Sequence, residues 1–164
     1  MAAELTTVYL SLGSNMGDRQ EMLEKAMEML SSRLRVDRVS TTYETEPVGD
    51  SKQPLFLNLA CQVTTRLQPM ALLTLAKGIE VRMGRKGKSG EPRPIDIDIL
   101  FYGEQVIDTP ELVIPHPRLT ERAFVLIPLA EIAPNLVHPV TGKTIKEILG
   151  GFREVQGVFR WEIP

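Results

Sequence analysis

The spacing of hydrophobic and polar residues along the chain predicts an ordered series of strands and helices. Residues 7–12 are mainly β-branched and apolar and run into a Gly-Ser-Asn sequence, which is typical of a strand that ends at a turn. Apolar residues then recur every three or four positions between 18 and 32, which predicts an amphipathic helix with Asp18 at its N-cap. The same spacing predicts a second helix from Pro69 to about Gly84, since proline suits a first helical turn and glycine a helix end.

Three further segments are predicted to be strands. Residues 35–42 form the first, and the segment 43–49, which contains proline and glycine, then breaks it. Residues 55–65 alternate between one core face and one available face. In residues 95–101 the isoleucines face one way and the aspartates the other. The two faces of the middle segment are Leu55, Leu57, Leu59, Cys61 and Val63 on the core side, and Phe56, Asn58, Ala60 and Gln62 on the other.

The order of these elements predicts the fold class. Strand, helix, strand, strand, helix, strand is the order of an α+β fold of the ferredoxin-like split βαβ type. In that arrangement two helices cover one face of an antiparallel sheet, and we expect the opposite face to carry the active site. C-terminal additions follow: an extended proline-rich segment at 110–117, a short helix at 119–132, a helical turn at 145–149 and a late strand around 159–161.

Length and composition favour one soluble domain. With 164 residues, of which 43% are hydrophobic, the chain can bury one core, so residues 1–164 are predicted to form a single domain. A net charge of -2 argues against a surface built as a whole to hold nucleic acid or an anionic membrane. No apolar run approaches the ~20 residues of a membrane span and the N-terminus lacks a secretion signal, so we expect a cytoplasmic protein. The single cysteine, Cys61, is expected to be a small buried residue.

Asp96 and Asp98 are the first candidates for chemistry. Two positions apart on a strand, they point the same way, with α-carbons ~6.6 to 6.8 Å apart. Carboxylates held in this way can bind hard divalent cations, and two-metal sites for phosphoryl transfer place their ions ~3.5 to 4 Å apart. The simpler alternative is that both aspartates only face solvent from the outer side of an edge strand.

A basic segment directly precedes these aspartates. Residues 84–93 contain four cations and three glycines and show no helix or strand pattern. A mobile cationic loop of this kind can close over a polyphosphate and exclude water, and the planar fork of arginine suits phosphate oxygens. The sequence therefore predicts a phosphate lid, with a merely solvated basic loop as the alternative.

Two histidines and one turn complete the candidates. His116 lies between two prolines that restrain its backbone, so its ring could donate to phosphate, and Arg122 could join it. An ordinary loop histidine and a surface arginine are the alternatives. His138 has no chemical group beside it in the sequence and is assigned a structural role. The turn at 13–17 lacks the lysine and spacing of a phosphate-binding loop, so we expect it to position other loops.

Seven short motifs occur in a fixed order along the chain. They are Leu12-Gly13-Ser14-Asn15, Tyr43-Glu44-Thr45-Glu46-Pro47-Val48-Gly49, Phe56-Leu57-Asn58, Ile79-Glu80 with Gly84-Arg85, Pro92-Arg93-Pro94-Ile95-Asp96-Ile97-Asp98-Ile99-Leu100, Pro115-His116-Pro117 and Arg122-Ala123-Phe124. As an ordered set they resemble the 6-hydroxymethyl-7,8-dihydropterin pyrophosphokinase family of folate biosynthesis, over roughly residues 7–150.

This resemblance implies an activity and a set of site residues. The activity is transfer of the pyrophosphoryl group of ATP to the hydroxymethyl group of the pterin, with release of AMP and with two Mg²⁺ ions. The implied partners are these two small molecules, without nucleic acid or membrane, and the implied state is a monomer. The implied catalytic residues are Arg85, Arg93, Asp96 and Asp98, of which Asp96 and Asp98 bind the metal. The implied pterin residues are Thr45, Glu46, Val48, Phe56, Asn58 and Phe124, and the implied nucleotide residues are Glu80, Arg85, Arg93, Ile99, His116 and Arg122.

Two other functions fit parts of the pattern. Paired carboxylates also occur in other metal-dependent nucleotidyl transferases, which would release pyrophosphate instead of AMP. A non-catalytic, ferredoxin-like RNA-binding module could use the basic segment and the open face of the sheet. Such a module should display several aromatic residues on neighbouring strands, and Phe56 is the one fair candidate, so this function is less favoured.

Overall fold

The fold is built on a six-stranded antiparallel sheet. In the computed structural model, which describes residues 4–47, 53–85, 91–153, 155 and 157–161, the strand order is β5-β1-β4-β3-β8, and β2 also pairs with β4. Every pairing in this sheet is antiparallel. The predicted α+β class is therefore confirmed. The strands are β1 (Thr6–Ser14), β2 (Arg35–Val39), β3 (Tyr43–Thr45), β4 (Phe56–Thr65), β5 (Asp96–Tyr102) and β8 (Val158–Arg160).

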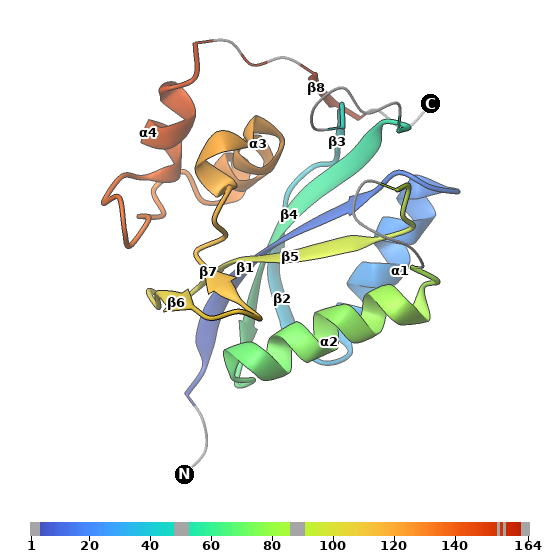
Figure 1. Cartoon of the computed structure of the whole chain (residues 1–164), viewed down its shortest axis with the longest axis horizontal. Coiled ribbons are helices and arrows are strands. Elements are labelled where there is room, and N and C mark those ends of the chain that lie inside the picture. The colour runs from blue at the N-terminus through green and yellow to red at the C-terminus, as the bar shows by residue number, and fades with distance from the viewer. Residues whose placement is uncertain (1–3, 48–52, 86–90, 154, 156, 162–164) are drawn as a thin grey trace.

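Two helices cover one face of the sheet, as the sequence predicts. They are α1 (Arg19–Ser31) and α2 (Pro69–Arg82), which lie together on one side of the strands in Figure 1. The Asp18 carboxylate accepts a hydrogen bond from the Glu21 backbone N–H, so Asp18 is the N-cap of α1. The core between this layer and the sheet includes Leu10 and Leu12, the two central apolar residues of β1, which are fully buried.

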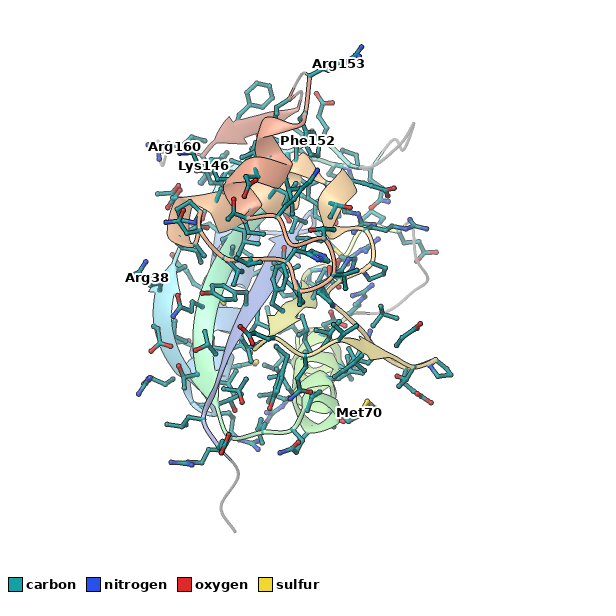
Figure 2. All side chains as sticks on the ribbon, turned by 90° about the vertical axis from the view of Figure 1, so that its left-hand side faces the viewer. Arg38, Met70, Lys146, Phe152, Arg153 and Arg160 are labelled. Atoms are coloured by element: carbon teal, nitrogen blue, oxygen red, sulfur yellow. The ribbon has the colours of Figure 1, made fainter. Side chains whose placement is uncertain are left out.

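The opposite face of the sheet is only partly open, which corrects the prediction. The helices α3 (Ala123–Ile132) and α4 (Ile145–Gly150) lie over it, after the short 3-10 helix η1 (Leu119–Glu121) (Figures 1 and 2). A second apolar cluster joins Ala60 and Phe101 of the sheet to α3. These side chains would expose apolar surface without a cover, and an α3 sequence that is apolar almost throughout supplies one. The end of the face that carries Phe56 and the two aspartates stays free of this cover.

Several element boundaries also differ from the predictions. The segment 43–49 begins with the short strand β3 and does not break the sheet there, because Tyr43 to Thr45 pair with β4. Leu55, assigned to the core, precedes β4 and is 39% exposed. The helix predicted at 119–132 is divided into η1 and α3, because Arg122 between them has an extended backbone.

The C-terminal additions otherwise follow the prediction. The extended segment contains the short strand β7 (Val113–Ile114), which pairs with β6 (Ile107–Asp108) in a hairpin that was not predicted. The helical turn and the late strand are confirmed as α4 and β8. Cys61 is fully buried in β4, and burial raises the pKa of its thiol to about 12. Within the described ranges, no helix has both the length and the apolar character that a membrane span requires.

Candidate active site

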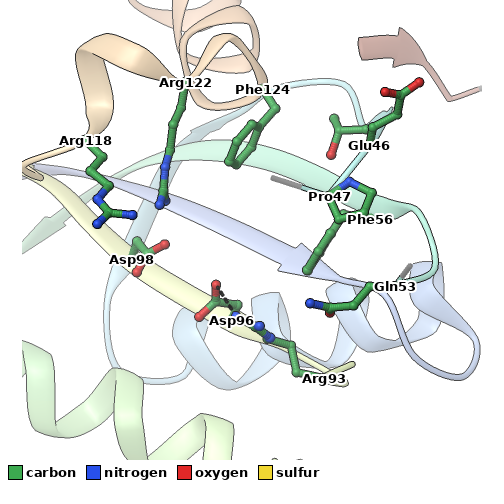
Figure 3. A pocket seen from close by; sticks show the side chains of 11 residues that line it. Glu46, Pro47, Gln53, Phe56, Arg93, Asp96, Asp98, Arg118, Arg122 and Phe124 are labelled. Atoms are coloured by element: carbon green, nitrogen blue, oxygen red, sulfur yellow. Dashed lines mark ion pairs between the residues drawn. The ribbon is translucent and has the colours of Figure 1, made fainter. Parts of the chain in front are cut away.

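Asp96 and Asp98 project from one face of β5 into a common pocket (Figure 3). Ile97 and Ile99, on the other face of the strand, are 5% exposed and belong to the core below α1 and α2. Strand β1 pairs with β5 along this length, with Gly13 opposite Asp96. The packed isoleucines and the paired backbone hold the two carboxylates in the common direction that the alternation predicts.

The pocket has a volume of about 280 Å³ and draws side chains from four separate parts of the chain. It lies at the uncovered end of the sheet face, where β3, β4 and β5 meet the segment that leads into α3. Its lining residues are Thr45, Glu46, Pro47, Gln53, Phe56, Arg93, Asp96, Asp98, Arg118, Arg122 and Phe124.

Two arginines hold Asp96. The Arg85 guanidinium donates to Asp96 Oδ1 at 2.7 Å, and Arg93 Nη1 lies 3.5 Å from Asp96 Oδ2. Both cations come from the ends of the predicted lid, whose residues 86–90, including Lys86 and Lys88, lie outside the described residues. The negative charge of Asp96 is therefore neutralised by these two arginines.

Glu80 supports this arrangement from below the pocket. Its side chain is 4% exposed, lies 3.1 Å from Arg85 Nη1, and accepts a hydrogen bond of 2.8 Å from the Ile97 backbone N–H. Burial raises the pKa of Glu80. Predicted as a nucleotide residue, Glu80 is not among the pocket-lining residues, and its contacts fix both Arg85 and strand β5.

The negative charge of Asp98 is less neutralised by neighbouring basic groups than that of Asp96. Among the described residues, the one basic side chain within ion-pair distance of Asp98 is His116, with Nε2 at 4.0 Å from Asp98 Oδ1, and it forms an ion pair only when protonated. Burial, followed by the negative charge of Asp96, raises the pKa of Asp98 to about 7. The environment therefore disfavours two negative charges at this place unless a cation is bound.

His116 is held in one orientation. Its Nδ1 accepts a hydrogen bond from the Arg118 backbone N–H at 3.3 Å, and its own backbone N–H donates to the Leu100 carbonyl at 3.1 Å. Burial, and then the positive charge of Arg122, lower the pKa of His116, so the ring is neutral at pH 7. A neutral ring that accepts at Nδ1 carries its proton on Nε2, which points toward Asp98.

Phe56 and Phe124 place two aromatic rings at the other end of the pocket (Figure 3). A cation lies over each ring: Arg93 is 5.7 Å from the Phe56 centroid, and Arg122 is 5.6 Å from the Phe124 centroid. A flat apolar ligand can stack against such rings while the arginines remain available at their edges.

Asn58 lies behind this end of the pocket. It is 5% exposed, and its amide donates to Thr45 Oγ1. A side chain at Gly13 would place a Cβ atom 2.4 Å from Asn58 Oδ1, so glycine at position 13 is what leaves room for this amide. Asn58 thus sits against Thr45, which lines the pocket.

Asn15 connects three segments around the pocket. Its Oδ1 accepts from the Arg93 backbone N–H at 2.8 Å, and its Nδ2 donates to Gln53 Oε1 at 2.9 Å and to the Pro54 carbonyl at 3.3 Å. The prediction that the turn at 13–17 positions other loops is confirmed by these contacts.

The remaining predicted residues lie elsewhere. The side chain of Ile99 is in the core, on the opposite side of β5 from Asp98, and Val48 lies outside the described residues. Three lining residues were not predicted: Pro47, Gln53 and Arg118. The signals for them were weak, although Pro47 belongs to a quoted motif and Arg118 directly follows the Pro-His-Pro motif.

A family model described as 7,8-dihydro-6-hydroxymethylpterin-pyrophosphokinase (HPPK) matches residues 9–134, which is more than half of the chain. The chain belongs to the HPPK family. HPPK transfers a pyrophosphoryl group from ATP to hydroxymethyldihydropterin in folate synthesis. The resemblance seen in the ordered motifs is therefore confirmed.

Three relatives bear the name of this activity, and the chain matches each of them over most of its length. The chain is 45% identical over 144 residues to 2-amino-4-hydroxy-6-hydroxymethyldihydropteridine pyrophosphokinase of Aquifex aeolicus, covering 87% of this chain and 90% of the relative. It is 48% identical over 149 residues to the protein of that name from Methylorubrum extorquens, covering 88% and 92%. For the Bacillus subtilis protein of that name, identity is 41% over 154 residues, covering 92% of each.

Solved structures agree on the fold. An HPPK-DHPS structure from Plasmodium falciparum superposes with a TM-score of 0.76 at 20% identity, covering 90% of this chain. The match spans 45% of that longer chain, and at this identity it shows the fold alone. HPPK membership favours pyrophosphoryl transfer over the two alternatives, a different nucleotidyl transferase and an RNA-binding module.

Proposed function

We propose that this pocket carries out the family's reaction with the pterin between Phe56 and Phe124, and with Asp96 and Asp98 holding two Mg²⁺ ions under the phosphates of ATP. The observation that carries the proposal is the meeting of two carboxylates from one strand with an aromatic pair and several arginines in one pocket. Each of these groups matches one part of the two substrates.

The donor set fits magnesium. Carboxylate oxygens are the ligands that this hard cation prefers, and it usually takes one or two of them together with substrate phosphates and water. Within the described ranges, no group of three or more histidine, cysteine, aspartate or glutamate side chains could hold a metal ion, so the protein would supply two carboxylates and leave positions for phosphate. When bound, the ions would neutralise charge on the phosphate oxygens. The pKa of Asp98 is raised by burial and then by the negative charge of Asp96, and a bound cation would offset both effects by stabilising the ionised carboxylate.

Asp96 would become free to bind a metal ion when its two arginines turn toward phosphate. Arg85 and Arg93 neutralise the charge of Asp96. Phosphate oxygens offer both guanidinium groups a second set of acceptors, with the bidentate geometry that arginine prefers. Because Glu80 also holds Arg85, this side chain would turn from Asp96 toward phosphate while keeping one protein contact.

The pterin would occupy the end of the pocket that holds Phe56, Phe124 and Thr45. Its flat ring would stack on the two phenylalanines, and the main chain around Thr45 and Glu46 would bind its polar edge. Asn58 would act through its hydrogen bond to Thr45 as well as toward the ligand. This position leaves the hydroxymethyl group of the pterin facing the aspartates.

The nucleotide would occupy the end near His116. The Nε2–H of His116 and the guanidinium of Arg122 would donate to phosphate oxygens. Ile99 would contribute its main chain, because its side chain is in the core and β5 is an edge strand. Glu80 would act on the nucleotide through Arg85.

In the reaction, the pterin hydroxyl attacks the β-phosphorus in line. A bond forms from the pterin oxygen to this phosphorus, the bond from the phosphorus to the oxygen shared with the α-phosphate breaks, and AMP leaves with that oxygen. The proton of the hydroxyl group passes to water. Catalysis of such transfers comes mainly from positioning and from stabilising charge on the phosphate oxygens. Arg85, Arg93, His116 and Arg122 surround the place where this charge develops.

The test is AMP release from ATP in the presence of Mg²⁺ and 6-hydroxymethyl-7,8-dihydropterin. We expect Asp96→Asn and Asp98→Asn each to lower kcat by roughly 100-fold or more, the size seen when one electrostatic contact to a transition state is lost, with little change in pterin affinity. Asp108→Asn, at an exposed aspartate of β6 outside the pocket, is the matched control. Near-normal magnesium-dependent AMP formation by the Asp96 variant would show that the metal site is elsewhere.

Two further expectations concern the whole molecule. We propose that the protein acts as a monomer, which size-exclusion chromatography with light scattering would test, and that it works in the cytoplasm, which fractionation would test. Neither bears on the assignment of the pocket.

A further inference from the structure

Arg118 is a pocket residue to which the sequence motifs assign no role. It precedes η1, two residues after His116, and its side chain extends beside Arg122 toward Asp98 (Figure 3). Among the described residues, its guanidinium group makes no hydrogen bond or ion pair to the protein, and the contact of Arg118 with His116 runs through the backbone N–H. Within this part of the chain, no hydrogen bond or ion pair of the side chain explains its position.

The arginines of the site differ in how they are compensated. Arg85 and Arg93 lie within ion-pair distance of Asp96. Arg122 lies over the ring of Phe124 and, like Arg118, has no carboxylate within ion-pair distance in the described part of the chain. Two uncompensated cations thus face the less compensated of the two aspartates.

Arg118 and Arg122 lie side by side at this end of the pocket (Figure 3). This end of the pocket therefore carries positive charge that the protein does not neutralise. A bound anion would neutralise it, and the anion that the proposed function brings here is the phosphate chain of ATP.

We propose that Arg118 is a further substrate-binding residue, which contacts the phosphate chain of the nucleotide on the side of Asp98 that faces away from Phe56. The proposal rests on the proposed function, because it takes the nucleotide from it. Arginine suits the task, since its planar fork can donate two hydrogen bonds to one phosphate group.

The position of Arg118 is fixed by strand β5. The Arg118 backbone N–H donates to His116 Nδ1, and the His116 backbone N–H donates to the Leu100 carbonyl on β5. Asp98 lies two residues before Leu100 on the same strand. The backbone of Arg118 and the two carboxylates are therefore held on one frame.

Three variants separate the proposed role from a structural one. Arg118→Ala removes the guanidinium group and keeps the backbone N–H that holds His116. Arg118→Lys keeps the charge without the fork. Arg153→Ala is the matched control, because Arg153 is exposed and points away from the molecule, far from the pocket-lining residues (Figure 2).

For each variant we would measure the dissociation constants of a non-hydrolysable ATP analogue with Mg²⁺ and, separately, of the pterin, together with thermal unfolding and turnover. For Arg118→Ala we expect the analogue to bind roughly 10- to 100-fold more weakly, the range for loss of a charge-assisted hydrogen bond. Pterin affinity and Tm should remain those of the wild type, and the lysine variant should recover part of the loss.

Two results would overturn the role of Arg118: wild-type affinity of Arg118→Ala for the analogue, or an equal loss of affinity for the analogue and the pterin. Failure of the proposed function gives a different signature. In that case the wild-type protein itself forms no AMP, or Asp96→Asn keeps normal turnover. If Arg118→Ala turns over and binds the analogue as the wild type does, the role of Arg118 is refuted and the proposed function stands.

Discussion

The fold disfavours a charge on the buried Glu80 side chain. Glu80→Gln should therefore maintain or raise the free energy of unfolding while it weakens ATP binding. Burial raises the pKa of Glu80, so the folded state binds a proton at this group more readily than the unfolded state. The stability contribution of Glu80 is therefore complete below its unfolded-state pKa and is lost as the pH rises through its folded-state pKa. At pH 7 to 8 the ionised carboxylate thus destabilises the fold relative to a neutral group of the same shape.

The size of the effect follows from the hydrogen bond that Glu80 accepts from Ile97 and from its ion pairs with Arg85 and Lys77. Glutamine keeps an oxygen that can accept from the Ile97 N–H, so the loss of about 1 to 3 kcal/mol for an unpaired buried N–H is avoided. We expect the free energy of unfolding of Glu80→Gln at pH 7 to 8 to equal or exceed that of the wild type. Glu80→Ala removes the acceptor and leaves a cavity, so it should lose about 2 to 4 kcal/mol.

The same substitution should weaken the binding of ATP. Without the negative charge of Glu80, Arg85 keeps only the Asp96 carboxylate as an ion-pair partner among the described residues. Arg85 should then turn toward phosphate less readily. We expect the KM for ATP of Glu80→Gln to rise by roughly 3- to 10-fold, equivalent to about 1 kcal/mol, with pterin binding unchanged.

The assay is urea unfolding at pH 6, 7 and 8 without nucleotide or magnesium, followed by steady-state kinetics. Glu111→Gln, at an exposed glutamate, is the matched control. If the glutamine variant at Glu80 unfolds at the same lowered urea midpoint as the alanine variant, the carboxylate charge stabilises the fold, and the derived sign is wrong.

Three further changes have expected outcomes. Gly13→Ala puts a Cβ atom 2.4 Å from Asn58 Oδ1, so pterin affinity should fall at least tenfold in a fluorescence titration. Gly150→Ala, at an exposed glycine with open space around it, should leave pterin affinity unchanged. Asn15→Ala removes hydrogen bonds to separate pocket segments. It should raise the KM of both substrates and lower the free energy of unfolding in urea by about 2 kcal/mol. A change in the KM of one substrate alone would contradict this. Burial raises the pKa of Glu131, but hydrogen bonds from Thr41 and Tyr43 lower it more. The ionised carboxylate therefore stabilises the fold above its unfolded-state pKa, and this stabilisation is lost as the pH falls through the folded-state pKa. In parallel urea titrations, Glu131→Gln should be less stable than wild type at pH 7, and the difference should shrink by pH 3.5.

The parts of the site that depend on local periodicity were predictable. Alternation along residues 95–101 is enough to place Asp96 and Asp98 on one side and the isoleucines in the core, because side chains of a strand alternate whatever packs around it. The same argument places Phe56 on the available face of β4. Its partner ring, Phe124, was found from a motif and not from periodicity.

The parts that depend on packing between distant segments were not predictable from local patterns. The apolar stripe of α2 includes positions beside Glu80, yet nothing in that spacing shows that its carboxylate reaches Ile97 on β5. Likewise, Ala60 and Phe101 look like residues of an open face until α3 covers them. Arg118 is indistinguishable from a surface arginine until the chain brings it beside Asp98.

Contacts at the outer edge of β5 also bear on solubility. An edge strand presents free backbone groups to which another chain can add a strand, which is a route to aggregation. In β5 the outward N–H of Ile97 is taken by the Glu80 carboxylate, and the outward carbonyl of Leu100 is taken by the His116 N–H. The strand that presents the two aspartates to the pocket is thereby closed to strand addition at these two positions, and the protein can keep its reactive carboxylates accessible without offering the backbone beside them to a second copy.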